Sequence, residues 1–468
     1  MERPRAAERI ERLPFTTWQW GIMAMAVAAW IAEAIDIVMS GATLPSLKAQ
    51  FHLSPSEIGA FAGAATSGIV ITLLFVGILI DQFGKRKVLL IGMLVFGVGT
   101  FATAFVPSMG ALLLLRFLTG LGLGAVFPIP YQYIVELMPS GVRGSSMSIV
   151  GAALFFGYFL NLLIASYVIP HDGWRPMYVI GGGITIAFLV AIALFMPESP
   201  RWLEVKGRYD EANRVLERIE RAVVRDCGGR VLPAISETLE PVESKSVPVA
   251  QIFRGELLRR TIMVWVMAAC VWTGFYFFSV YLPEMGRMRG FTLGAALLLA
   301  AVTNGAPIPL HIAGAWLLER WGRRPTIFLF EALGLAGIIL FVVSKSYFGA
   351  LFGAAMAFGF ISATSNFTKL VAAEAYPTRL RGTGTAWMEA VARAVAGVAI
   401  PFILAGVLAN SGIAAASAVA FAAGVIGIFA YYALGSETRG TVLEKLDPGA
   451  VPAVDGDAAP AVAVAGLR

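Results

Sequence analysis

Residues 116–144 read RFLTGLGLGAVFPIPYQYIVELMPSGVRG, an apolar run that begins with an arginine and ends in a charged, proline-containing motif. This motif, from Glu136 to Gly144, has the spacing E-x-x-P-x-x-x-R-G. The same spacing returns in EAYPTRLRG at residues 374–382, which is 238 residues further along the chain. Each copy closes one apolar segment and opens another, so the pattern predicts that the chain consists of two similar halves.

Two further pairs of acidic residues in similar sequence contexts are separated by almost the same number of residues. Asp81 in the run DQFGKR and Glu319 in the run ERWGRR lie 238 residues apart. Glu198 and Glu437, each just after the last apolar segment of its half, lie 239 residues apart. Three marks with a constant offset indicate a duplicated unit, an arrangement common among membrane transporters.

The composition indicates a membrane protein rather than a soluble one. Of the 468 residues, 58% are hydrophobic and only 14% are charged. The apolar runs are long enough to cross about 30 Å of hydrocarbon as helices, and they lack the alternation of barrel strands. Twelve membrane-spanning helices are expected at 19–45, 56–80, 88–106, 109–135, 144–169, 174–196, 260–284, 291–318, 325–345, 347–373, 382–408 and 411–435.

The fold class is therefore an all-α polytopic membrane protein with two pseudo-symmetric six-helix bundles. A break in the apolar pattern separates the bundles and contains an amphipathic segment in which Ala212, Leu216 and Ile219 recur at helical spacing. We expect an N-terminal arm at 1–18, a first bundle at 19–196, a linker at 197–258, a second bundle at 259–435 and a partly disordered tail at 436–468.

The basic residues fall on alternate connections between the expected spans. Only Lys48, Arg175, Arg287, Arg289 and Lys345 fall on one side, and Arg116, Lys369 and Arg393 fall inside spans, which leaves 28 of the 36 on the other side. By the positive-inside rule, both termini are expected in the cytoplasm. The same distribution argues against nucleic acid as the partner of this chain, whose formal net charge is +6.

The motifs resemble those of the major facilitator superfamily. GILIDQFGKR at 77–86 is similar to the loop signature of that superfamily, and 116–144, PESPR at 197–201 and the paired E-x-x-P-x-x-x-R-G motifs resemble its sugar-porter branch. Within it, RLP at 12–14, the Glu33/Asp36 pair and PESPRWL at 197–203 are most similar to the bacterial relatives of synaptic vesicle glycoproteins. That group includes nicotinate (niacin) transporters and aromatic-acid/proton symporters.

The resemblance implies a secondary transporter of a bacterial inner membrane. It is expected to import a small organic acid with protons by alternating access, with nicotinate as the leading substrate. The implied partners are a small organic anion, protons and the lipid bilayer, and the protein is expected to be a monomer without a cofactor or metal. A sugar or polyol symporter is the alternative among transporters, although span 260–284 is aromatic and lacks the glutamines that grip sugar hydroxyls. A membrane receptor would need a signalling domain, and an enzyme would need a nucleophile–base or metal set, which we do not see.

The repeated motifs form a candidate gate or latch at the cytoplasmic helix ends. The resemblance implies that it holds an outward-open state, with Asp81 at the N-terminus of span 382–408 and Arg86 paired with acids such as Glu136. The alternative is a role in topology and folding alone. The candidate residues are Gly77, Asp81, Gly84, Arg86, Glu136, Arg143, Glu198, Glu319, Arg323, Glu374, Arg381 and Glu437. Glu319 stands where an aspartate is usual, and Ala315 and Ser436 also depart from the pattern.

Three charged residues inside the first bundle are candidates for proton coupling. Glu33 and Asp36 lie near the membrane centre in span 19–45, where buried carboxylates usually mark ion or proton pathways. Arg116 lies at a depth similar to that of Asp36. The pair resembles the aspartate–arginine proton switch of sugar/proton symporters, and the alternative is a permanent structural ion pair.

Arg393 is the candidate anchor for a substrate carboxylate because an arginine near the midplane is costly without an anion. The alternative is internal neutralisation by Glu389, one helical turn earlier. Trp272 and Tyr276 lie at the right depth to stack on a flat substrate, although aromatic residues in spans are more often packing groups. Further candidates for the cavity are Tyr131, Gln132, Asn161, Asn304, Asn366 and Trp387.

Several other features are interpreted as structural. The glycines in GLGLG at 120–124 lie inside an expected membrane helix and serve helix packing rather than nucleotide binding. We expect His311, close after two prolines, to be structural, and Lys369 to extend toward the cytoplasmic interface. At the 238-residue offset, Ala354 corresponds to Arg116 and Phe155 corresponds to Arg393, so the chemistry is expected where the repeat is broken.

Overall fold

The computed structural model describes residues 6–235, 249–376 and 380–435, apart from the side chains at 319 and 381–383. Within these ranges every regular element is a helix. The first bundle consists of α2 (Thr17–Phe51), α3 (Pro55–Phe83), α4 (Lys85–Thr103), α5 (Met109–Val126), α6 (Ile129–Leu137), α7 (Ser140–Asp172) and α8 (Arg175–Phe195). The second bundle consists of α11 (Gly255–Met288), α12 (Leu293–Gly305), α13 (Pro307–Trp321), α14 (Arg323–Val343), α15 (Tyr347–Ala375), α16 (Arg381–Arg393), the π-helix η2 (Ala394–Ala399) and α17 (Ile400–Leu434).

In the part of the chain that the structure describes, eleven stretches of helix are long and apolar enough to cross a membrane, and the last of them holds two spans. It runs over 51 residues, Gly384–Leu434, or about 75 Å if it were one straight helix. Gly412 interrupts it with φ 79° and ψ −174°, a conformation that side chains other than glycine's rarely allow. The chain therefore turns back at Gly412, and the fold is the expected one of twelve spans in two bundles.

Prolines explain why two of the spans are each built from two helices. Pro128 and Pro130 lie at the junction of α5 and α6, and Pro307 begins α13 directly after α12. A proline cannot donate a backbone hydrogen bond, and its ring clashes with the preceding turn, so each span bends there.

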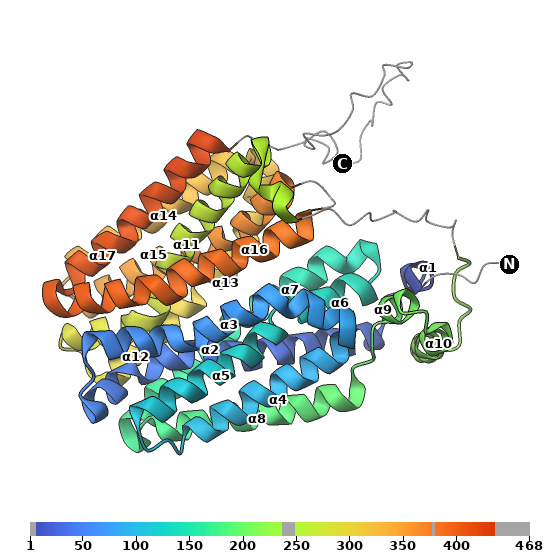
Figure 1. Ribbon diagram of the computed structural model, residues 1–468, viewed down its shortest axis with the longest axis horizontal. Helices are drawn as coiled ribbons and strands as arrows, with labels where there is room; N and C mark the ends of the chain where they lie inside the picture. The colour runs from blue at the N-terminus through green and yellow to red at the C-terminus, as the bar shows by residue number, and fades with distance from the viewer. Residues whose placement is uncertain (1–5, 236–248, 377–379, 436–468) are drawn as a thin grey trace.

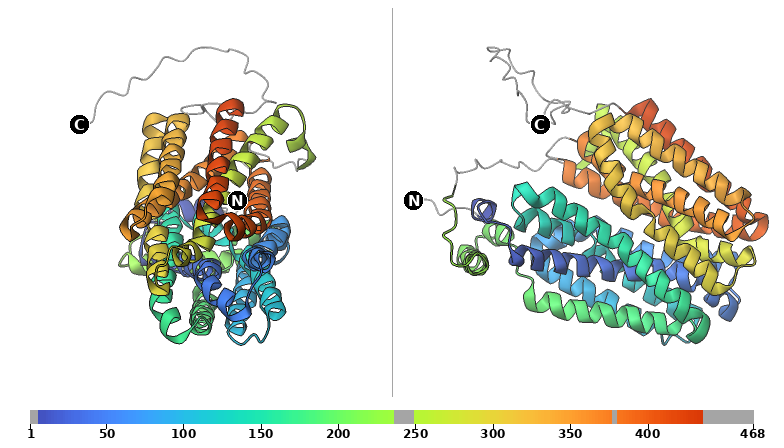
Figure 2. Two further views of the ribbon diagram at one scale, coloured as in Figure 1. Left: turned by 90° about the vertical axis from the view of Figure 1, so that its left-hand side faces the viewer. Right: turned by 180° about the vertical axis from the view of Figure 1, so that it is seen from behind.

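Figure 1 shows the two bundles side by side, with the first below the second. Helices α9 (Pro200–Val205) and α10 (Tyr209–Asp226) lie at one end of the bundles, which we call the linker end, and the right-hand view in Figure 2 shows α1 (Ala6–Glu11) beside them. The opposite end, with residues 48–54 and 284–292, is called the far end. The bundles meet along α2–α11, α3–α17 and α7–α12, and Figure 1 shows their linker ends lying further apart than their far ends.

Close approach of the two bundles toward the far end depends on small residues and one ion pair. A Cβ added to Gly41 of α2 would lie on the carbonyl oxygen of Ser279 and 3.0 Å from the Cα of Val280, both in α11. Lys48 of α2 then donates to the Glu284 carboxylate of α11 at 2.5 Å. The far end is thus closed by contacts between the halves.

The N-terminal arm fastens the linker to the first bundle. As the apolar spacing predicted, α10 is an amphipathic helix that buries Ala212, Leu216 and Ile219. Arg9 and Arg12 both donate to the Glu220 carboxylate, at 2.6–2.9 Å. Burial alone would raise the pKa of Glu220, but these hydrogen bonds outweigh it and hold the pKa below its ordinary value.

Candidate functional site

Helix α2 presents two carboxylates to different surroundings. Glu33 and Asp36 are three residues apart, so both lie on one broad face of the helix, and each is only 1% exposed. Asp36 faces α4 and α5, whereas Glu33 lines a central cavity. The two acids therefore have different partners despite their proximity in sequence.

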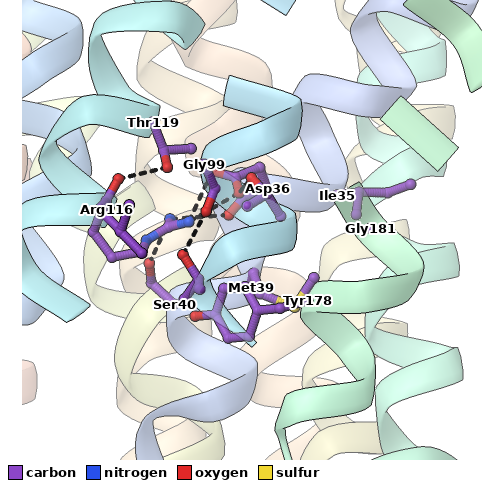
Figure 3. A network of polar contacts seen from close by, with 12 residues as sticks. Ile35, Asp36, Met39, Ser40, Gly99, Arg116, Thr119, Tyr178 and Gly181 are labelled. Atoms are coloured by element: carbon purple, nitrogen blue, oxygen red, sulfur yellow. Dashed lines mark hydrogen bonds and ion pairs between the residues drawn. The ribbon is translucent and has the colours of Figure 1, made fainter. Parts of the chain in front are cut away.

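Asp36 and Arg116 form a fully enclosed ion pair within the first bundle (Figure 3). The Arg116 Nη1 donates to both Asp36 oxygens at 2.9 and 3.0 Å, and Nη2 donates to the Asp36 carbonyl at 3.2 Å and to Ser40 Oγ at 3.0 Å. Thr100 Oγ1 adds a hydrogen bond to Asp36 Oδ1 at 2.6 Å. Each charged group is thus compensated within the bundle, as a buried pair requires.

The central cavity lies between the two bundles and has a volume of about 30 Å³. This is room for one or two water molecules rather than an organic acid, so a substrate needs some lining side chains to move. The lining consists of Trp30, Glu33, Ile37, Ile69, Phe127, Tyr131, Gly151, Leu154, Phe155, Tyr158, Trp272, Phe275, Tyr276, Ser365, Asn366, Lys369 and Arg393.

Arg393 of α16 extends into this cavity between two aromatic rings. Its guanidinium carbon lies 4.2 Å from the ring centre of Phe127 in the first bundle and 4.2 Å from that of Trp272 in the second. Its Nη1 donates to the Glu389 carboxylate one turn earlier on the same helix. The cation therefore contacts both halves and has both aromatic and carboxylate partners.

Lys369 of α15 adds a second cation to the cavity. Its Nζ lies 3.8 Å from a Glu389 oxygen and 5.7 Å from the centre of the Phe127 ring. The sequence-based expectation that Lys369 extends toward the membrane interface is wrong, because a carboxylate and an aromatic face within the protein hold its ammonium group. Depth along a span could be read from the sequence, but the direction of the side chain could not.

Glu33 is the carboxylate of the cavity with the fewest partners. Its Oε2 is buried and has no hydrogen-bond partner among the described residues. The charges that act on it most strongly are those of Arg393 and Lys369 across the cavity. Burial of a carboxylate without donors is costly unless the group binds a proton.

A π-helix and a glycine bring α3 and α11 close to the site. Helix α16 ends at Arg393 and continues as the π-helix η2, an irregularity that is frequent at functional sites. A Cβ at Gly397 in η2 would lie 2.5 Å from Thr66 of α3 and 2.7 Å from the Tyr276 ring of α11. A larger residue at 397 would push both helices away from the cavity.

The structure brings together most, but not all, of the residues predicted for substrate binding. Glu33, Tyr131, Trp272, Tyr276, Asn366 and Arg393 line the cavity, and Glu389 lies directly behind Arg393. Three candidates lie outside it: Trp387 packs on Phe253 of η1 (Val249–Phe253), Asn304 donates to the Ala300 carbonyl, and Gln132 is not among the lining residues. Asn161 also serves the backbone, donating to the Ile35 carbonyl at 3.2 Å.

The latch residues of the first half interact with one another at the linker end. The expected Arg86–Glu136 pair is wrong: Lys85 binds Glu136 at 2.6 Å, and Arg86 donates to the Met196 and Ala193 carbonyls. Consecutive residues on a helix point about 100° apart, so only one of the two can face α6. The Glu198 carboxylate accepts from the backbone N–H groups of Arg86 and Ser199, and burial raises its pKa.

Other latch residues are placed as follows. Gly84 (φ 89°) joins α3 to α4, and a Cβ there would lie 2.5 Å from the Glu198 carboxylate. The Asp81 side chain and Gly77 are exposed, the Asp81 carbonyl accepts from Trp202 Nε1 at 2.9 Å, and Arg143 lies 3.7 Å from Glu11. In the second half Arg323 binds Glu374 at 2.8 Å, the counterpart of Lys85 with Glu136. The side chains of Glu319 and Arg381, and all of Glu437, lie outside the described residues.

The sequence model of the Major Facilitator Superfamily matches residues 22–401. The chain belongs to this superfamily. Its members are transporters and not enzymes, in agreement with the sequence-based expectation. As a member, the chain is a multi-pass membrane transporter with two six-helix bundles.

Two curated relatives from Acinetobacter baylyi cover most of this superfamily member. The niacin transporter NiaP is 28% identical over 397 residues, 85% of this chain and 89% of the relative. The 4-hydroxybenzoate transporter PcaK is 30% identical over 408 residues, 85% of this chain and 87% of the relative. These matches confirm the resemblance to nicotinate and aromatic-acid transporters.

The fold is also that of a solved superfamily transporter. The xylose transporter XylE of E. coli, in a partially occluded inward-open conformation, matches with a TM-score of 0.71 over 91% of this chain and all of that one. Sequence identity in that match is only 20%. The likeness therefore concerns the arrangement of the helices and not the residues of the cavity.

Proposed function

We propose that this transporter imports a small aromatic carboxylate, with nicotinate as the leading candidate, together with protons. The observation that carries the proposal is the Arg393 guanidinium in a central cavity, flanked by the rings of Phe127 and Trp272. A cation supplies a charge-assisted bond to a carboxylate, and aromatic faces suit a flat ring. The relatives named for niacin and 4-hydroxybenzoate support this class of substrate, since both compounds are aromatic carboxylates.

The orientation that we propose for the protein in the membrane is based on the distribution of its basic residues. The linker end carries most of the lysines and arginines, so we place it in the cytoplasm of a bacterial inner membrane, with both termini on that side. The contacts of Lys48 with Glu284 and of Gly41 with α11 then close the periplasmic side. In this orientation the conformation faces inward, and alternating access closes the linker end through the latch residues.

Protons are proposed to couple through the acids of α2. Glu33 lies in the cavity beside Arg393 and Lys369, and Asp36 holds Arg116 one turn further along. Protonation of Glu33 changes the charge next to the substrate, and protonation of Asp36 weakens its contact with Arg116; either change can favour one conformation. Sugar or polyol transport gains no specific support, since the cavity presents cations and aromatic rings rather than a set of amides.

The test is uptake of labelled nicotinate and 4-hydroxybenzoate into proteoliposomes, with and without an inward proton gradient. We expect uptake that the gradient accelerates several-fold, that Arg393→Gln reduces strongly and that excess xylose does not compete with. Competition by xylose but not by either acid would favour the sugar alternative. Uptake that is indifferent to the gradient would remove proton coupling from the proposal.

A further inference from the structure

Four charged side chains surround the central cavity, two acids and two bases. The bases are Arg393 on α16 and Lys369 on α15, and the acids are Glu389 on α16 and Glu33 on α2. The lining also contains three tyrosines, Tyr131, Tyr158 and Tyr276. A tyrosine phenol is neutral near pH 7, so these side chains add no charge. The next charges, Asp36 and Arg116, neutralise each other inside the first bundle.

Glu389 is held between the two bases in the way an anionic ligand would be. One oxygen accepts from Arg393 Nη1, and the other lies 3.8 Å from Lys369 Nζ. That second oxygen is buried without a hydrogen-bond partner among the described residues. The carboxylate is thus bound firmly on one side and loosely on the other, directly behind the cavity wall.

We propose that the Glu389 carboxylate competes with the carboxylate of the substrate for Arg393 and Lys369, which makes Lys369 a second substrate-binding cation. The inference rests on the proposed function and assigns the chemistry of the anion site within it. When a substrate anion binds the two cations, Glu389 withdraws from Lys369 toward its own helix. Both cations then keep an anionic partner, so their burial stays compensated.

The number of co-transported protons follows from the charges of this set. With all four groups ionised, the two acids and two bases cancel, and a bound monoanion leaves one uncompensated negative charge. In a low-dielectric site such a charge is costly, and uptake of one proton removes the cost. Glu33 is the receiving group because its Oε2 has no donor and, unlike Glu389, it forms no ion pair among the described residues. One proton therefore accompanies each anion.

A permanent structural role for Glu389 and Lys369 makes different predictions, which three variants separate. Glu389→Gln leaves one cation in excess, so an anion binds without a proton. Lys369→Gln removes a cation, so the empty site takes up one proton by itself; anion binding then weakens and still requires one further proton. The double variant restores the neutral balance of the wild type. Lys369→Arg keeps the charge and serves as the matched control.

The experiment measures the Kd of nicotinate and of 4-hydroxybenzoate in purified full-length protein, between about pH 6 and pH 9, where their carboxylates are ionised. Proton uptake is measured by calorimetry in two buffers with different heats of ionisation. For the wild type we expect the Kd to rise about tenfold per pH unit at the alkaline end, the slope for one proton. In Glu389→Gln we expect a change of less than about twofold per unit and at least about tenfold tighter binding near pH 9.

The remaining variants complete the test. Lys369→Gln is expected to bind at least about tenfold more weakly with the wild-type slope, and Lys369→Arg to stay within about threefold of the wild type. The double variant is expected to recover the wild-type slope. A wild type that binds either acid without proton uptake, or a Glu389→Gln protein that keeps the wild-type slope, overturns the inference and leaves carboxylate transport intact. A wild type that binds and transports neither acid overturns the proposed function and this inference together.

Discussion

The ion pair of Asp36 with Arg116 and the cluster of Arg393, Glu389 and Lys369 use the same chemistry to different effect. In the first bundle, both Asp36 oxygens accept from Arg116, and the guanidinium is 0% exposed. In the second, a Glu389 oxygen has no hydrogen-bond donor among the described residues, and Lys369 is partly exposed. The Asp36 carboxylate is saturated because both oxygens accept, although Arg116 Nε has no acceptor among the described residues. A saturated carboxylate resists exchange of partners, whereas one with an unbonded oxygen next to a cavity can give way to a new anion. The comparison separates an ion pair enclosed within one bundle from the cluster that we propose binds the substrate.

The largest expected effect comes from breaking the saturated pair. Asp36→Asn leaves the buried Arg116 charge uncompensated and is expected to lower stability by about 3–5 kcal/mol. Glu33→Gln on the same helix is the matched control, and we expect it to change stability by less than about 1 kcal/mol, since its carboxylate lacks a donor at Oε2. Thermal unfolding of detergent-solubilised protein measures both. Equal effects of the two variants would contradict the distinction between the two regions.

The next effect is the loss of the cation from the unsaturated cluster. Arg393→Gln removes a charge-assisted bond of about 1.5–3 kcal/mol, so nicotinate binding should weaken roughly 10- to 100-fold. Arg393→Lys keeps the positive charge and should lose less. Equilibrium binding to purified protein measures the difference. Full-strength binding by Arg393→Gln would show that the cluster is only structural.

A smaller effect is expected at the ion pair that joins the bundles at the far end. Glu284 is buried, but the Lys48 side chain is 44% exposed, so the pair is worth about 0.5–1 kcal/mol. Glu284→Gln should therefore shift the conformational equilibrium about two- to fivefold away from the inward-facing state. Labelling of a cysteine placed at the far end measures this shift. The exchanged pair Lys48→Glu with Glu284→Lys should reverse it, and an exchanged pair that labels like Glu284→Gln would argue against a gate.

The smallest effect is a pH dependence of the N-terminal arm. Because the pKa of Glu220 is depressed in the folded protein, its contribution to stability is present above its unfolded pKa of about 4.5. That contribution is lost as pH falls through the lower folded pKa. Protease cleavage of the arm should accelerate only in this acid range and should become independent of pH in Glu220→Gln. Release of the arm in the wild type at neutral pH would contradict the assignment.

Much of the fold could be predicted because the apolar runs and the motifs between them indicate where the membrane-spanning helices begin and end. The repeated E-x-x-P-x-x-x-R-G motifs and the long apolar runs identified two bundles of six spans. The division of spans at Pro128 and Pro307 was missed, because each of these apolar runs continues through its proline. The π-helix after Arg393 also left no sequence signal, because it depends on packing of Gly397 against Tyr276.

For the candidate site, the sequence predicted how deep each residue lies in the membrane but not where its side chain points. Asp36 and Arg116 were matched correctly because their depths agree and their spans are neighbours in the superfamily. The direction of a side chain around its helix decided the rest: Lys369 turned into the cavity, and Lys85 rather than Arg86 faced Glu136. The pair of Lys48 and Glu284 was missed because nothing in one sequence shows which ends of the two halves meet.

The most direct test of proton-coupled carboxylate import is the initial rate of nicotinate uptake into proteoliposomes under an imposed pH gradient at zero membrane potential. If an anion and a proton cross together, the rate should rise several-fold with an inward proton gradient, and a membrane potential alone should have little effect. An identical rate with and without the pH gradient would contradict the account.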